Sequence, residues 1–201
     1  AGILYSASMG LASAQETVTS PTEQFGHQVG DDYKLINYTQ FEAYIKKLES
    51  ESPRIKLVAM GPTAEGRTQW MTVITSPQNQ AKLDHYKSIS AKLAHAEGID
   101  EEAARLLAEE GKAIIWIDGG LHATETVGAH QLTRTIHMLA SATDPEIMRI
   151  LDDVVVLLVH ANPDGMELVS NWYMRKRDPE ERAYDDLPRL YQKYVVIGAF
   201  L

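Results

Sequence analysis

The sequence predicts an α/β fold built on a mixed, largely buried sheet with helices on both faces. Segments 113–117 (AIIWI) and 154–159 (VVVLLV) are continuous apolar runs, and such runs are typical of strands that are buried on both faces. A helical pattern lies between them, long enough to serve as a crossover, so the two strands should run parallel.

Upstream of these runs, the pattern predicts a helix and then two strands. Thr39 and Glu42 have the spacing of a capping box, and the apolar residues that follow recur at spacings of three and four as far as Ser50. Segments 55–60 and 69–75 have strand composition and are joined by a turn rich in glycine and proline.

The remaining segments predict helices with recognisable starts and stops. They are a helical region from Pro77 to about His95, a helix from the N-cap Asp100 to Glu110, a helix over about 124–140, and a short helix that begins at Asp144-Pro145.

Composition limits the classes of function. The 201 residues suit one domain, and a formal net charge of -9 is unfavourable for binding nucleic acid. The basic run at 175–177 is followed directly by acidic residues, so it does not form a phosphate-binding stripe. With no cysteine in the chain, a metal ion would have to be held by His, Asp or Glu.

The first 14 residues are small, apolar and uncharged, and Ala12-Ser13-Ala14 has the form of a signal-peptidase site. We interpret residues 1–14 as the remnant of a signal peptide, which predicts a secreted or periplasmic protein; an unrelated tail is the alternative. The stretch is too short to span a membrane, which needs about 20 apolar residues, and we expect no integral membrane segment elsewhere.

The segment with the clearest chemistry is His122-Ala123-Thr124-Glu125, which follows an expected strand and a pair of glycines. Ligands of open α/β sheets collect at the carboxyl ends of strands. On a first helical turn, the side chains of His122 and Glu125 would point the same way and could bind one zinc ion. The alternative is a surface histidine beside a glutamate that favours the helix N-terminus.

Three further features are ambiguous by themselves. Asn162-Pro163-Asp164-Gly165 is a turn signal by default. Arg175 could stabilise an oxyanion near a metal, or it could belong to a basic surface run. His130 and His137 lie on one face of the expected helix, and we expect them to be packing or surface residues rather than ligands.

The order of these segments resembles the M14 family of zinc carboxypeptidases. The similar segments are GPTAEGR at 61–67, IDGGLHATE at 117–125, NPDG at 162–165 and MRKR at 174–177. The resemblance covers about 32–177. It implies that His122 and Glu125 are two of three protein ligands of one zinc ion, and that Arg175 polarises the scissile carbonyl or holds the oxyanion. It also implies that metal-activated water hydrolyses the C-terminal residue of a peptide or protein substrate.

Other parts that the resemblance implies are not found in the sequence. No histidine follows His160 to serve as third ligand, no Asn-Arg pair follows Tyr194, and Thr124 stands where many members carry arginine. We therefore expect 15–201 to be a truncated, inactive part of the catalytic domain that binds zinc weakly or not at all. An exposed sheet edge should make it self-associate. The apolar segment Val195–Leu201 is either a native end or a frameshifted or artificial one, and the sequence leaves both open.

Two other functions remain possible from the sequence. A non-catalytic binding module could use the same α/β scaffold, and a plain structural α/β domain could carry the motifs by accident.

Overall fold

A computed structural model gives the fold of the chain and describes residues 18–182. The predicted signal-peptide remnant at 1–14, the region after Tyr194 and the segment 195–201 lie outside the described residues.

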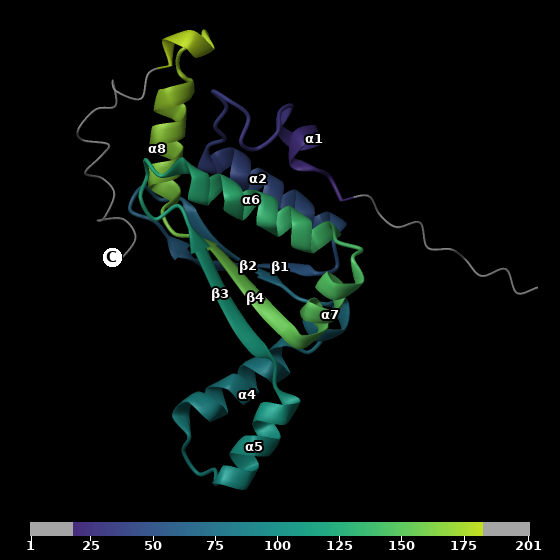
Figure 1. Ribbon diagram of the computed structural model, residues 1–201. Helices are drawn as coiled ribbons and strands as arrows, with labels where there is room; N and C mark the ends of the chain where they lie inside the picture. Colours follow the sequence, from purple (N-terminus) through teal and green to yellow (C-terminus); the bar gives the residue numbers. More distant parts are fainter. Residues whose placement is uncertain (1–17, 183–201) are drawn as a thin grey trace, which may run out of the picture.

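The centre of the molecule is a mixed four-stranded sheet in the order β1-β2-β4-β3 (Figure 1). Neighbours β1 and β2 are antiparallel, as are β2 and β4, whereas β3 and β4 are parallel. The α/β class and the parallel pair predicted from the sequence are therefore confirmed. The strands are β1 (Ile55–Pro62), β2 (Thr68–Ile74), β3 (Ala113–Gly119) and β4 (Val154–His160).

Apart from α1, which the sequence did not predict, the helices begin close to the predicted places, with three corrections described below. They are α1 (Pro21–Phe25), α2 (Tyr38–Glu51), α3 (Pro77–Gln80), α4 (Leu83–His95), α5 (Glu101–Glu110), α6 (Thr126–Ser141), α7 (Pro145–Asp153) and α8 (Pro163–Met174), with a 3-10 turn η1 (Pro179–Glu181).

The predicted N-caps Asp100 and Asp144 are confirmed, since each carboxylate accepts hydrogen bonds from backbone N–H groups of its own first turn. The capping box of α2 lies two residues earlier than predicted, at Asn37 and Gln40. Glu42 has other partners, because its carboxylate accepts the indole N–H of Trp70 at 2.9 Å.

Two further helix predictions are corrected. The region from Pro77 to His95 is two helices, with a break between Gln80 and Leu83. Segment 162–165 begins α8, whereas the sequence indicated a turn. The turn-like pattern arises because Asn162 is the N-cap and Pro163 the first helical residue, the position at which proline is favoured.

The core lies between the sheet and helices α2 and α6, which run side by side over one face (Figure 1). Helix α2 is amphipathic, and its apolar stripe is buried, as the spacing predicted. The buried residues of α2 are Tyr38, Phe41, Tyr44, Ile45 and Leu48, and apolar residues of α6 and β4 complete the cluster.

The predicted burial of the two apolar strands is confirmed for β4 and wrong for β3. Leu158 in β4 is 1% exposed, whereas its neighbour Ile117 in β3 is 37% exposed and Trp116 is 51% exposed. The difference follows from strand order: β4 lies between β2 and β3, and β3 is at the edge of the described sheet. The other large exposed side chains of β3 are Ile114 and Ile115.

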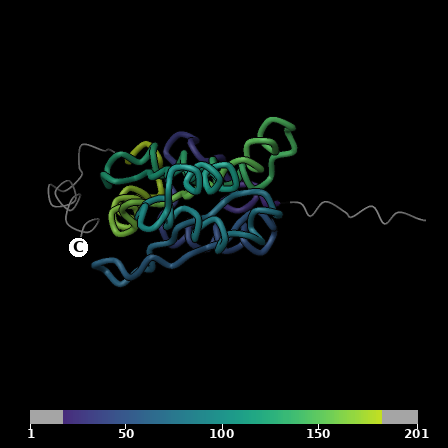
Figure 2. The backbone as a smooth tube through the Cα atoms, turned by 90° about the horizontal axis from the view of Figure 1, so that it is seen from below, coloured from purple at the N-terminus to yellow at the C-terminus, as the bar shows by residue number. Residues whose placement is uncertain are grey.

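Helices α4 and α5 form a hairpin that projects from the end of the sheet opposite α8 (Figure 1). Figure 2 views the molecule from the hairpin end. The two helices are linked by His85 and Glu110, whose side-chain atoms Nε2 and Oε1 are 2.9 Å apart. Within 18–182, no helix has the length and apolar character needed to cross a bilayer.

Candidate metal centre

The loop between β3 and α6 brings His122 and Glu125 together. His122 Nδ1 lies 2.9 Å from Glu125 Oε2, and their side chains are 45% and 70% exposed. A backbone hydrogen bond of 3.0 Å from Glu125 N–H to the carbonyl of His122 closes the turn that precedes α6. The two side chains lie in contact, but in this turn and not on the first helical turn that the sequence predicted. The pair is therefore accessible to a ligand.

The start of α8 supports this loop from the side. Parallel pairing places Gly119 beside His160, and the N–H of Ala161 donates to the carbonyl of Gly119 at 2.9 Å. Asn162 then uses both ends of its amide: Nδ2 donates to the carbonyl of Leu121 at 3.1 Å, while Oδ1 caps α8. One side chain thus fixes the helix start against the residue next to His122.

A third segment, the β1–β2 turn, is attached through the carboxylate of Asp164. Oδ1 accepts from the hydroxyl of Thr63 at 2.8 Å and from Nη1 of Arg67 at 2.7 Å, and Oδ2 accepts from the N–H of Glu65 at 3.1 Å. The Asp164 side chain is 9% exposed. Sequence reasoning missed this contact, because no local pattern links residues so far apart along the chain.

Arg175 is not brought to the His122–Glu125 pair. It follows the last residue of α8, where its guanidinium stacks 4.0 Å from the ring centre of Trp172 and donates to the carbonyl of Trp172. A 12-residue helix is about 18 Å long, and α8 leads away from the β3–α6 loop (Figure 1). The role predicted for Arg175 is therefore not tested by this geometry.

Two histidines near the loop are held in the interior. His130 Nε2 accepts the N–H of Ile36 at 3.0 Å and Nδ1 donates to the carbonyl of Thr126 at 2.7 Å, so the ring packs as predicted. Burial lowers the pKa of His130, and it lowers the pKa of His160 to about 3. Both rings are therefore neutral near pH 7. Burial also lowers the pKa of the half-buried His137.

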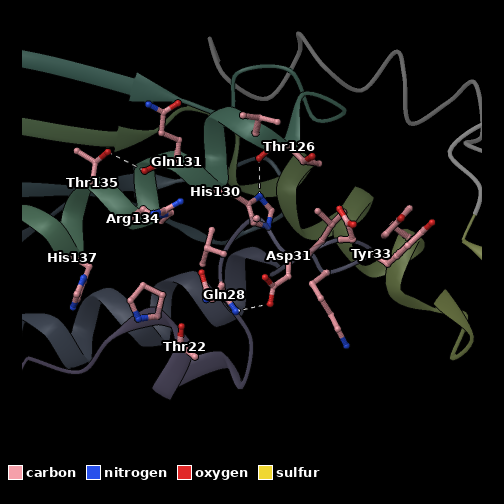
Figure 3. A pocket seen from close by; sticks show the side chains of 18 of the residues that line it. Thr22, Gln28, Asp31, Tyr33, Thr126, His130, Gln131, Arg134, Thr135 and His137 are labelled. Atoms are coloured by element: carbon pink, nitrogen blue, oxygen red, sulfur yellow. Dashed lines mark hydrogen bonds between the residues drawn. The ribbon is translucent and has the colours of Figure 1, made fainter.

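A large cavity lies between residues 21–35 and α6 (Figure 3). Its volume is about 940 Å³, and its walls include Asp31 and Tyr33 on one side and Arg134 and His137 of α6 on the other. His122 and Glu125 do not line it. The candidate ligand pair is thus on an open loop and not inside this cavity.

The family model of Peptidase M14, described as zinc carboxypeptidase, matches residues 41–195. The chain belongs to this family. The comparison with curated proteins gives no match.

Three solved structures match this M14 chain in part. Thrombin activatable fibrinolysis inhibitor (TAFI) matches with a TM-score of 0.50 and 12% identity, over 83% of this chain and 32% of that one. Carboxypeptidase A from Helicoverpa armigera matches with a TM-score of 0.48 and 21% identity, over 70% of this chain and 27% of that one. A metallo-carboxypeptidase from Burkholderia cenocepacia matches with a TM-score of 0.46 and 20% identity, over 66% of this chain and 28% of that one. The chain thus spans a third or less of the length of these structures.

The M14 family implies zinc, and the chemistry of the pair fits that ion. An imidazole nitrogen and a carboxylate oxygen are ligand types that zinc takes in proteins, and here they converge on one side of the loop. A catalytic zinc normally has three protein ligands. Within 18–182, no group of three or more His, Asp or Glu side chains is placed to hold a metal. His122 and Glu125 are therefore two candidate ligands in the described part of this M14 chain, without a third beside them.

We predict that the Asp164 carboxylate stabilises this arrangement more than any one of its partners. Asp164→Ala should lower the free energy of unfolding by about 3 kcal/mol, since it leaves three donors without their acceptor, and Arg67→Ala should lower it by about 1 kcal/mol. Urea denaturation measures both. Glu65→Ala is the matched control, because Glu65 contributes its backbone N–H. A loss for Asp164→Ala no larger than that of the control would contradict the prediction.

Proposed function

We propose that the chain is part of a zinc metallocarboxypeptidase that hydrolyses C-terminal residues from peptides or proteins. The observation that carries the proposal is the contact between His122 and Glu125, in the segment IDGGLHATE of a member of the M14 family. The order of the four similar segments and the placement of the pair at the carboxyl end of a strand support it.

In this proposal His122 and Glu125 would hold the zinc ion. A bound zinc supplies Lewis-acid polarisation of a carbonyl and lowers the pKa of a coordinated water. The chain's own contribution is to orient the two ligands. The turn closed by the Glu125 N–H brings both side chains together, and Asn162 binds the carbonyl of Leu121, the residue before His122. Arg175 would polarise the scissile carbonyl or hold the oxyanion once it leaves Trp172.

We further propose that 15–201 is an incomplete catalytic domain, inactive by itself, and that 1–14 is the remnant of a leader to a secreted or periplasmic site. The presence of only two candidate ligands within 18–182 supports the inactivity. The same observation favours the alternative of a non-catalytic binding module on this scaffold.

We predict weak or no zinc binding by this chain, because two protein ligands are too few for a catalytic site. Calorimetric titration with zinc should show no tight 1:1 binding, and His122→Ala should change the heats little. His137→Ala is the control for a histidine outside the pair. Tight stoichiometric binding that is lost in His122→Ala and kept in His137→Ala would overturn this prediction.

We predict carboxypeptidase activity for a chain extended by the coding sequence that follows residue 201. The assay is release of the C-terminal residue from a peptide, with the C-terminally amidated peptide as a control substrate. His122→Ala should abolish release, and Arg175→Ala should lower kcat about 10²- to 10³-fold if the guanidinium stabilises the oxyanion. Arg177→Ala is the matched basic control. The proposed enzyme activity would be contradicted if release persisted in His122→Ala. It would also be contradicted if the extended chain bound peptides without hydrolysing them, and this second result would favour the binding module.

We predict that this chain self-associates through β3. An edge strand with apolar side chains on both faces is a template for pairing, and the large side chains of β3 are exposed. Sedimentation or light scattering should show concentration-dependent association that Trp116→Lys reduces. Val127→Lys is the control, since Val127 is also exposed but lies in α6. Equal reduction by both substitutions would place the contact elsewhere.

A further inference from the structure

Two buried polar side chains beneath the His122–Glu125 loop have no hydrogen-bond partner within 18–182. His160, at the end of β4, and Ser170, in α8, are each 1% exposed, and neither ring nitrogen of His160 nor the hydroxyl of Ser170 is paired. Buried polar groups in native proteins are nearly always paired with protein or ordered water, because leaving them unpaired destabilises the fold.

Ser170 also lacks the local bond that a helical hydroxyl usually makes. Thr133 and Ser141 of α6 each donate to the carbonyl four residues earlier, at 3.2 and 2.8 Å. Ser170 makes no such bond to Met166. Its hydroxyl is therefore left for a partner outside its own helix turn.

Both unpaired groups line one small cavity. Its volume of about 10 Å³ is close to that of one water-sized sphere. A direct bond between His160 and Ser170 is not formed, so a bridging molecule is needed to satisfy both. The cavity is also lined by Gly120, Ala123, Ala129 and Met166, and by His122, Glu125, Thr126 and His130 on the loop and α6.

Gly120 provides the room beside the imidazole. A Cβ at this position would lie 2.8 Å from both Cε1 and Nε2 of His160. That ring edge therefore faces a place where any other residue would put a side chain. Gly120 also has φ of 71°, a left-handed conformation that favours glycine.

We propose that a single buried water molecule binds in this cavity and bridges His160 to Ser170. A neutral imidazole has one donor and one acceptor nitrogen and a hydroxyl has both functions, so one water can bond to one ring nitrogen of His160 and to the hydroxyl of Ser170. The size of the cavity excludes a larger molecule. This proposal is independent of zinc.

The first test is the sign of the effect of Ser170→Ala on stability. If the hydroxyl is bridged, its removal leaves the bound water and His160 short of a partner, and the folded-to-unfolded ratio should fall about fivefold. If the hydroxyl has no partner, removal relieves a buried polar group and the ratio should stay the same or rise, which would overturn the proposal. Urea denaturation at one fixed protein concentration measures the ratio.

The second test is a double-mutant cycle with His160→Leu. The bridge predicts that Ser170→Ala has a smaller effect in the His160→Leu background than in the original chain, because the shared water has already lost one partner. Ser141→Ala is the matched control: its hydroxyl bonds within its own helix, so its effect should be the same in both backgrounds. Equal effects of Ser170→Ala in both backgrounds would exclude a bridge.

A third readout does not depend on the variants being stable. In the original chain, NMR should detect a long-lived water by its cross-relaxation with the His160 ring, and a neutral ring whose 15N shifts show one hydrogen-bonded acceptor nitrogen. A His160 ring without a water contact, and with the shifts of a free acceptor nitrogen, would contradict the proposal.

Discussion

In a parallel pair both strands end at the same edge of the sheet, and β3 and β4 are held in that register from Ala113 beside Val154 to Gly119 beside His160. The loops that leave this edge must therefore lie side by side. Backbone and side-chain bonds from Ala161 and Asn162 fix one loop to the other. The positions of the candidate ligands depend on this pairing more than on any contact that the ligands make themselves.

Features set by residues near one another in the sequence were predictable. The N-caps Asp100 and Asp144 need only their own first turns, and the three-residue spacing of His122 and Glu125 is short enough to predict their contact. The capping box of α2 was placed wrongly because Glu42 bonds to Trp70, 28 residues away. The same reason explains why the bond between Arg67 and Asp164, 97 residues apart, left no readable signal. The start of α8 was misread because Asn-Pro favours a turn and a helix start alike.

Burial was the property that local sequence described least well. The runs AIIWI and VVVLLV have the same apolar character, yet only the second is buried. Hydrophobicity indicates that a strand can be covered, whereas its place in the strand order decides whether it is. Arg175 shows the same limit for the site: the residue type suits an oxyanion, but the length of α8 and the ring of Trp172 decide where the guanidinium lies.

The strand order also has a consequence for the order of folding. The hairpin of β1 and β2 pairs residues close in sequence and can form as soon as Thr68–Ile74 has been synthesised. Strand β3 is synthesised before β4, yet β4 is its neighbour and also separates it from β2. Within the described chain, β3 therefore has no strand to pair with until β4 arrives. Among the described strands, the last one made is the one that joins β3 to the sheet, so the apolar run at 113–117 stays unpaired in the growing chain until then.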